Sequence, residues 1–214
     1  MATAPEFEGI QGWINTSPLT IGSLRGKVVL LDFWAYSCVN CVRTLPHISL
    51  LWEKYKKYPF VIIGVHTPEF DFERQRKNVE TAVEKHVITY PVALDSMNLT
   101  WKAYENQYWP RQAVIDHEGT LIWEHVGEGG YQEVEERIIA ALRVLGAPVH
   151  ESPEKNEVKN YSLGISPETY AGSRRNGKIG SSGLCTPLGC VYKDKGKHER
   201  DFIYLEGAWE QTEE

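Results

Sequence analysis

Two cysteines three positions apart are the residues in this sequence best suited to chemistry. Cys38 and Cys41 form a Cys-x-x-Cys pair in a chain that has four cysteines among its 214 residues. Cysteines this close can pass between a dithiol and a disulfide, and the thiolate is the attacking species in that exchange. A helix that begins at the pair would favour the thiolate form of the first sulfur. We therefore expect Cys38 to attack a partner disulfide and Cys41 to resolve the resulting mixed disulfide.

The residues around the pair predict the elements that position it. Val28–Trp34 is almost entirely apolar, which is typical of a strand buried on both faces. From Cys41 to Tyr58 the apolar residues recur at helical spacing. The pair is therefore expected where a central strand passes into a helix, a setting that favours redox chemistry over metal binding. A c-type haem site is excluded because Val42 rather than His follows Cys41.

Strands and helices are expected to alternate through residue 146. A second buried strand at 60–66 follows the first helix, so the βαβ rule makes it parallel to the first strand. The later segments are expected to be a helix at 71–86, a strand at 90–94, a helix at 99–108, a hairpin of 112–116 and 120–126, and a helix at 134–145. This order predicts an α/β fold with a central mixed sheet flanked by helices.

The composition changes after residue 146. Prolines and charges with few periodic apolar residues indicate a linker at 147–165, and Gly and Ser are frequent after it. We expect a main domain at 1–146 and a small β-rich extension at 166–214, with a strand within 201–209.

The second cysteine pair lies in the extension and is ambiguous. Four residues separate Cys185 from Cys190, and a turn there would bring the sulfurs within bonding distance. A structural disulfide is the favoured interpretation; free thiols and a second redox pair that relays to Cys38 and Cys41 remain open. A zinc site would need both pairs together, which the strand-to-helix setting of the first pair disfavours. No metal site is expected.

Charge and hydropathy exclude several partner classes. The net charge is −6, and the one dense basic run, 193–200, is interrupted by acidic residues, so no nucleic-acid partner is expected. No stretch approaches the ~20 apolar residues of a membrane span. The first six residues lack a basic and then apolar pattern, so we expect no signal peptide. A cytoplasmic chain and a soluble piece of a longer exported protein both remain open.

Several separated motifs resemble one family. Val29–Cys41, with Pro46 five residues on, resembles the active-site segment of thioredoxins, and the insertion at 66–92 resembles the TlpA/ResA branch of thioredoxin-like proteins. More specific segments are Gly64–Phe70, Tyr90–Asp95, Gln107–Pro110 and Gly127–Tyr131. They resemble the thioredoxin domain of DipZ-type cytochrome c biogenesis/thiol–disulfide interchange proteins, and more distantly that of NHL-repeat-containing protein 2.

This resemblance implies a thioredoxin fold with a TlpA-like insertion. It implies that the redox-active disulfide Cys38–Cys41 is the redox centre and that no other cofactor is needed. Asp32 matches the buried acid beneath the thioredoxin disulfide. Burial would raise the pKa of its carboxyl group, which could then accept the proton of Cys41. Ser166–Tyr170 resembles the start of the β-module that follows the thioredoxin domain in DipZ-type proteins, so the extension is expected to be a partial module.

The resemblance also assigns residues to substrate binding. Pro110 matches the cis-proline of the family, which would present the Trp109 backbone to an extended substrate segment. Trp34 matches the tryptophan beside the active site, although a purely core role remains open. Val39 and Asn40, between the cysteines, are also expected at the substrate. They replace the Gly-Pro of thioredoxin, so the direction of electron flow cannot be carried over.

The expected function is disulfide exchange with protein substrates, which makes the chain a thiol–disulfide oxidoreductase. Its expected partners are protein thiols or disulfides and an unidentified electron donor or acceptor. Two alternatives belong to other classes. A thiol peroxidase would need Thr and Pro where Ala35 and Leu31 stand, three and seven residues before Cys38. A non-catalytic interaction domain on a thioredoxin scaffold is disfavoured because both cysteines are present.

Overall fold

The expected alternation of strands and helices is present. The computed structural model describes residues 2–150, 182–186, 189–193, 196 and 207–209. The chain divides into two units, Met1–Asn156 and Glu157–Glu214, so that the division falls inside the expected linker. The elements of the first unit are β1 (Trp13–Ile14), η1 (Gly22–Leu24), β2 (Val28–Trp34), α1 (Val39–Tyr55), β3 (Phe60–His66), η2 (Asp71–Arg74), α2 (Arg76–Lys85), β4 (Val92–Leu94), α3 (Leu99–Ala103), β5 (Arg111–Ile115), β6 (Leu121–Val126) and α4 (Tyr131–Val144).

One mixed sheet organises the first unit. Its strand order is β1-β4-β3-β2-β5-β6, with β2 parallel to β3 and antiparallel to β5. All seven residues of β2 are buried, as the apolar run predicted. The register sets Asp32 of β2 directly between Gly64 of β3 and Gln112 of β5. The sheet therefore holds Asp32 at its centre.

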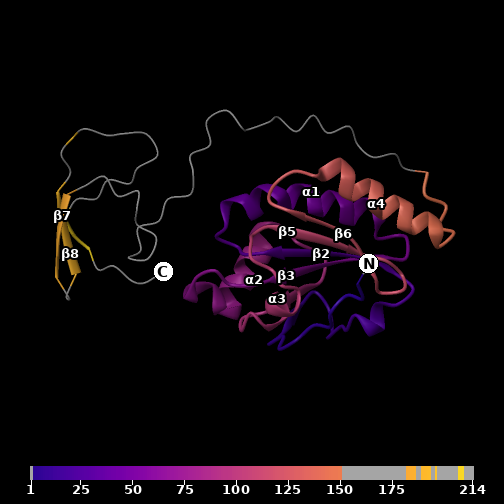
Figure 1. Ribbon diagram of the computed structural model, residues 1–214, viewed down its shortest axis with the longest axis horizontal. Helices are drawn as coiled ribbons and strands as arrows, with labels where there is room; N and C mark the ends of the chain where they lie inside the picture. Colours follow the sequence, from indigo (N-terminus) through magenta and orange to yellow (C-terminus); the bar gives the residue numbers. More distant parts are fainter. Residues whose placement is uncertain (1, 151–181, 187–188, 194–195, 197–206, 210–214) are drawn as a thin grey trace. The chain divides into compact units, whose positions relative to one another are not determined.

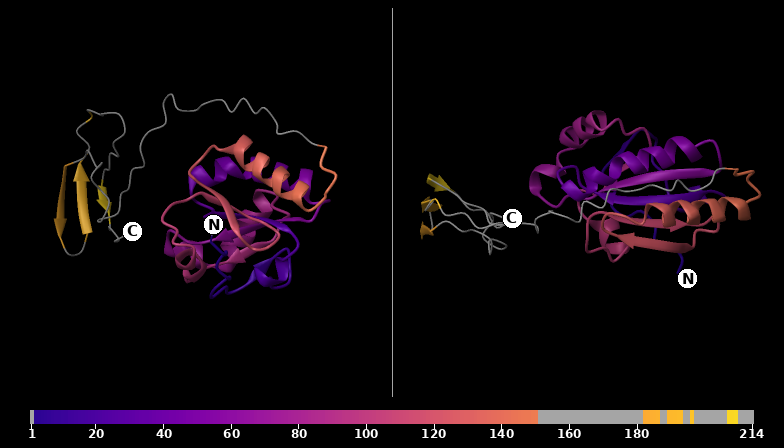
Figure 2. Two further views of the ribbon diagram at one scale, coloured as in Figure 1. Left: turned by 45° about the vertical axis from the view of Figure 1, so that its right-hand side comes forward. Right: turned by 90° about the horizontal axis from the view of Figure 1, so that it is seen from above.

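Helices cover both faces of this sheet. α1 and α4 lie side by side on one face, whereas α3 and the N-terminal segment lie on the other (Figures 1 and 2). Alternate residues of β2 pack into two cores: Leu30 and Trp34 join the core under α1 and α4, and Leu31 and Phe33 join the core against α3. Because successive side chains of a strand point to opposite faces, Asp32 faces α1 and α4.

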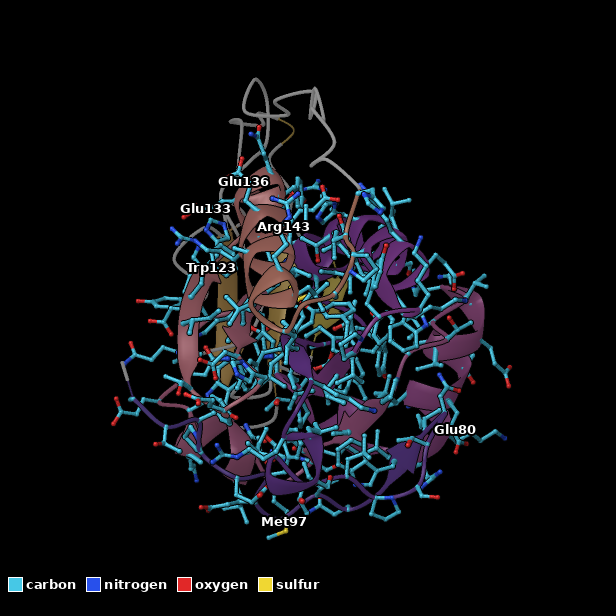
Figure 3. All side chains as sticks on the ribbon, turned by 90° about the vertical axis from the view of Figure 1, so that its right-hand side faces the viewer. Glu80, Met97, Trp123, Glu133, Glu136 and Arg143 are labelled. Carbon is cyan, nitrogen blue, oxygen red and sulfur yellow. The ribbon has the colours of Figure 1, made fainter. Side chains whose placement is uncertain are left out.

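The outer face of α4 is charged. Figure 3 shows Glu133, Glu136 and Arg143 extending from this helix. Val134 and Ile138 on its inner face are fully buried. This amphipathic pattern places α4 over the sheet, as the spacing of its apolar residues predicted.

Two expected helices differ from the structure. The helix expected at 71–86 is divided into η2 and α2, because Gln75 between them has an extended backbone with ψ of 114°. The helix expected at 99–108 ends at Ala103, and Glu105 just beyond it has a positive φ of 50°, which a helix cannot continue through. The two-residue strand β1 was not expected.

The second unit contains three antiparallel strands. These are β7 (Ser182–Thr186), β8 (Gly189–Lys193) and β9 (Gly207–Trp209), in the order β7-β8-β9. The backbone register sets Cys185 directly opposite Cys190. The side chains of both cysteines lie outside what the structure describes, so the disulfide between them stays a prediction.

No helix in the described part of the chain is long and apolar enough to cross a bilayer.

Candidate active site

Cys38 lies where β2 passes into α1, as expected. It is the N-cap residue of α1, and its Sγ accepts a hydrogen bond from the backbone N–H of Cys41 over 3.3 Å. A side-chain hydrogen bond with the Cys41 thiol lowers the pKa of the Cys38 thiol, and the backbone N–H groups of Cys41 and Asn40 add to the effect. Partial burial and the charge of Glu69 oppose it. The residue is half-buried, so the sulfur has access to solvent. Cys38 therefore has the environment of a reactive thiol.

Cys41 has the opposite environment. It lies in the first turn of α1 and is completely buried in the core beneath that helix. Burial raises the pKa of its thiol far above the usual range, and the neighbouring Cys38 adds to the effect. Cys41 thus holds its proton firmly and needs a base before it can act as a nucleophile.

Asp32 is placed to be that base. It is fully buried, and burial raises the pKa of its carboxyl group to about 7. Its charge contributes to the raised pKa of Cys41, so the two groups lie within electrostatic reach. Neither carboxyl oxygen has a hydrogen-bond partner in the described part of the chain. An acid that titrates near neutral pH is suited to accept and return a proton.

The turn before Cys38 is fixed by two side chains. The Tyr36 N–H donates to His66 Nε2 over 3.3 Å, and the Ser37 N–H and Oγ–H donate to Glu73 Oε1 over 3.2 and 2.7 Å. His66 is 1% exposed, and burial lowers the pKa of its imidazole to about 3, which leaves the ring neutral and able to accept.

Glu73 ties this turn to the inserted segment. The carboxylate is fully buried, and its second oxygen accepts from the N–H groups of Glu69 and Phe70 over 2.6 and 2.9 Å. One side chain therefore receives four hydrogen bonds, two from the turn that precedes Cys38 and two from the segment that enters η2. The position of the turn depends on this connection.

The loop before β5 ends at the same edge of the site. The Trp109–Pro110 peptide bond is cis. Arg111 pairs with Phe33, which sets Pro110 beside the carboxyl end of β2, where the turn to Cys38 begins. The Trp109 indole N–H donates to the carbonyl of Thr67 over 3.0 Å. This loop is thus joined to the inserted segment as well.

The remaining expected substrate residues differ in accessibility. Val39 is 55% exposed and Asn40 is half-buried, both beside Cys38. Trp34 is 0% exposed, and its side chain lies in the core with Cys41. It has no surface on which a substrate could lie, so the core role that the sequence left open is the one that fits.

Metal ligation finds no support in the arrangement of side chains. Within the described ranges, no three His, Cys, Asp or Glu side chains are grouped so that they could hold an ion. The candidate site therefore consists of two thiols and one carboxyl group.

Sequence reasoning missed the residues that support the site. His66 was given no role; it ends β3, is buried and acts as an acceptor. Glu73, Tyr90 and Gln112 were not singled out. Gln112 had a usable signal, because it is a polar residue within an apolar strand opposite Asp32. Gly64 also had a usable signal, since a lone glycine in a buried strand often marks a place where another part of the chain comes close to the backbone.

Comparison with known proteins places the chain in a family. The Redoxin family model matches residues 2–140. Protein DipZ of Mycobacterium bovis is 38% identical over 214 residues, which is 97% of this chain but 31% of that protein. The thiol–disulfide oxidoreductase YkuV of Bacillus subtilis is 28% identical over 138 residues, covering 64% of this chain and 93% of YkuV. The chain thus spans less than a third of the length of DipZ and nearly all of YkuV.

A solved structure agrees with these relatives. The solution structure of a thioredoxin-like protein in its oxidised form superposes with a TM-score of 0.60 at 29% identity, covering 66% of this chain and 95% of the other. The resemblance to DipZ-type and TlpA/ResA-type proteins and the thioredoxin-like α/β fold are confirmed. The chain belongs to the Redoxin family, among relatives that are thioredoxin-like thiol–disulfide oxidoreductases.

Proposed function

We propose that this chain exchanges disulfides with protein substrates through Cys38 and Cys41. One observation carries the proposal: the two sulfurs differ sharply. The pKa of the half-buried Cys38 is lowered at the start of α1, whereas the pKa of the fully buried Cys41 is raised. That asymmetry assigns attack to Cys38 and resolution to Cys41. The names of relatives such as YkuV support the same reaction class.

Attack begins with the Cys38 thiolate. Its sulfur bonds to one sulfur of a substrate disulfide, and the substrate S–S bond breaks. The other substrate sulfur leaves as a thiolate and takes a proton from water. The product is a mixed disulfide between Cys38 and the substrate.

Resolution needs a proton acceptor. Cys41 gives its proton to Asp32, and its sulfur then bonds to Cys38 while the bond from Cys38 to the substrate breaks. The second substrate sulfur leaves as a thiolate and is protonated. In total the substrate disulfide gains two electrons and two protons, and the cysteine pair becomes a disulfide. The reverse sequence oxidises a substrate dithiol.

The cysteine pair supplies the redox chemistry by itself, so no further cofactor enters these steps. The substrate segment is assigned to the surface beside Cys38, where Val39 is exposed and Asn40 is half-buried. The loop at Trp109 and Pro110 forms the other edge. A second thiol or disulfide partner must return the pair to its starting state after each turnover.

Insulin reduction by dithiothreitol tests the proposal. The wild-type chain should accelerate the precipitation of reduced insulin, and Cys38→Ser should lose that acceleration completely. A variant with Cys185→Ser and Cys190→Ser is the matched control and should keep the wild-type rate. If Cys38→Ser behaves like the wild type, the proposal is wrong.

Cys41→Ser separates the two roles. This variant can attack a substrate disulfide but cannot resolve the mixed disulfide, which should therefore accumulate. On a non-reducing gel it should appear as a band of higher mass that disappears when a reductant is added. Cys38→Ser should not trap a partner. Equal trapping by both variants would contradict the assignment of attack to Cys38.

A further inference from the structure

Three buried polar side chains around Asp32 are not used by the steps above. We infer that Tyr90 and Gln112 are positioning residues that hold internal water against Asp32 and so control when Asp32 can take the proton of Cys41. Asp32, Trp34, Tyr90 and Gln112 are here named the buried polar cluster. The effect on resolution by Cys41 rests on the proposed function, whereas the effect of Tyr90 and Gln112 on the ionisation of Asp32 does not.

The sheet register brings the cluster together. Gln112 lies directly opposite Asp32 in the antiparallel pair of β2 and β5, and opposite residues in such a pair have their Cβ atoms about 5 Å apart on one face. The side chain of Gln112 therefore begins beside that of Asp32 and on the same face of the sheet. Trp34 is two residues further along β2 and faces the same side.

Gly64 makes room for the other two members. It pairs with Asp32 on the β3 side of β2. A Cβ at this position would lie 3.1 Å from Trp34 Nε1 and 3.1 Å from Tyr90 Cε2, closer than ordinary contact. The indole N–H and the phenol ring therefore both lie over the glycine, next to Asp32. A residue with a side chain at this position would displace them.

The polar atoms of the cluster have no hydrogen-bond partner among the residues that the structure describes. These six atoms are both carboxyl oxygens of Asp32, Nε1 of Trp34, the hydroxyl of Tyr90, and Oε1 and Nε2 of Gln112. Their side chains are all 0% exposed. Buried polar groups in folded proteins nearly always find a partner, and internal water serves where side chains do not reach one another, typically with about three hydrogen bonds. Donors and acceptors gathered in one place make such a water site.

Among the described residues, no cation offsets the charge of Asp32. Burial is the sole cause of its raised pKa in the described part of the chain. The titratable groups that face Asp32 are Cys41 from α1, Tyr90 before β4 and Tyr131 from α4. Burial is the largest cause of the raised pKa of each group, and the charge of Asp32 contributes to all three. His47 lies against Tyr131, with ring centroids 4.4 Å apart, and burial lowers its pKa to about 4. The neighbouring strands β3 and β5 place Gly64 and Gln112 beside Asp32, and neither residue is titratable.

Hydrogen-bond donors are therefore the means of stabilising the ionised carboxylate. The Tyr90 hydroxyl and the Gln112 amide can donate to water that in turn donates to Asp32. A carboxylate accepts such hydrogen bonds more strongly than a carboxylic acid does, so they lower the pH at which Asp32 ionises. During resolution the proton passes from Cys41 Sγ through the water to Asp32. Tyr90 and Gln112 neither gain nor lose a proton.

Tyr90→Phe tests the inference without needing turnover. The titration of the Asp32 carboxyl carbon is followed by ¹³C NMR in the reduced protein, where removal of the hydroxyl should move the midpoint up by about one pH unit. Tyr104→Phe is the matched control. Its hydroxyl donates to the Pro5 carbonyl over 2.7 Å in the core on the other face, so the Asp32 midpoint should stay in place.

The resolution step supplies the kinetic readout. All Ellman measurements use a background with Cys185→Ser and Cys190→Ser, so that Cys38 and Cys41 are the two thiols left. This reduced protein is mixed with Ellman's reagent, and release of the second thionitrobenzoate reports attack by Cys41. The pH midpoint of that release should rise in Tyr90→Phe together with the carboxyl titration. Gln112→Met removes both amide atoms at similar volume and should produce a shift in the same direction, which keeps the test available if Tyr90→Phe does not fold.

Unchanged Asp32 midpoints in folded Tyr90→Phe or Gln112→Met would overturn the inference. So would an equal shift in Tyr104→Phe, because the effect would then be global. If the wild type proves inactive with disulfides, the proposed function fails. The carboxyl titration would still show whether Tyr90 and Gln112 set the pH at which Asp32 ionises.

Discussion

Two buried aspartates of this protein have the same burial and opposite surroundings. Asp95, after β4, accepts four hydrogen bonds: from the N–H groups of residues 99–101 over 2.8 to 3.1 Å, and from the Thr67 hydroxyl over 3.1 Å. Asp32 accepts none from any residue within the described ranges. Burial raises the pKa of both, and the hydrogen bonds oppose that rise only at Asp95. Asp95 thus fixes the start of α3, whereas Asp32 remains available to a proton.

Glu73 shows that closeness to the cysteines does not decide whether a buried acid fixes the structure or remains available to a proton. Its carboxylate receives four hydrogen bonds, as that of Asp95 does, but two of the donors belong to the turn that precedes Cys38. A fully hydrogen-bonded acid holds structure, even when it lies beside the reactive thiol. An acid without protein partners in the same region is the one suited to chemistry.

The largest expected effect concerns stability and pH. The pKa of Asp32 is about 7 in the folded protein against an ordinary value of 3.8. Between these pH values the unfolded chain has lost the proton that the folded chain still holds. The contribution of the protonated Asp32 to the free energy of unfolding is therefore fully present below pH 3.8. It is lost as the pH rises through 7, and the total loss is about 4 kcal/mol. Urea unfolding of wild type and Asp32→Asn from pH 4 to 8 should show this loss in the difference between the two. A constant difference would mean that Asp32 ionises normally.

Asp95→Ala should give the next largest effect, and on stability alone. It leaves three N–H groups of the first turn of α3 and the Thr67 hydroxyl without their acceptor, so the free energy of unfolding should fall by about 3 kcal/mol in urea at pH 7. Release of the second thionitrobenzoate should keep its wild-type rate and pH midpoint. Asp71→Ala, at a 78% exposed position in η2, is the control and should change stability little. A slowed release in Asp95→Ala would remove the contrast with Asp32.

Asp32→Asn should affect the rate of one step. Without a proton acceptor, resolution by Cys41 at pH 7 should slow about 100-fold, in the range for loss of a general base. The first thionitrobenzoate release, which reports attack by Cys38, should remain within a factor of about two, since a lone general base acts only on the step whose proton it accepts. The ratio of the two rates in one stopped-flow trace measures this directly. Equal slowing of both steps would point to a distorted site instead.

The elements that carry this contrast differ in how well the sequence predicts them. β2 and β3 were predicted with their bounds, because long apolar runs mark strands buried on both faces. The place of Cys38 and Cys41 at a helix start followed from the run at 28–34 together with the helical spacing after Cys41, and the resemblance to thioredoxins implied the burial of Asp32. Trp34 could have been assigned to the core in the same way, since it faces the same side of β2 as Leu30.

The supporting contacts could not be predicted, because they join segments distant in sequence. Glu73 and Ser37 are 36 residues apart, and nothing near either of them indicates the other. The break at Gln75 and the early end of α3 depend on single backbone angles that helical spacing does not report. Asp32 lies within β2 and Asp95 directly after β4. Which of them is hydrogen-bonded depends on the positions of N–H groups in three dimensions, which the sequence does not give.

Glu73→Gln should give the smallest effect. The amide keeps one acceptor oxygen but turns an NH2 group toward two donors, so half of the four hydrogen bonds are lost and the free energy of unfolding should fall by about 2 kcal/mol. A looser turn should also slow the first thionitrobenzoate release by less than about tenfold, because Cys38 would be held less well.

Glu80→Gln is the matched control for that variant. Glu80 is half-exposed on α2 and pairs with Arg76, so the same substitution there removes one surface ion pair and should leave the first release unchanged. If the two variants attack equally fast, the four hydrogen bonds of Glu73 stabilise the fold without positioning Cys38. Glu73 would then match Asp95 in function as well as in bonding, and Asp32 would be the one buried carboxyl group of the three that acts on the chemistry.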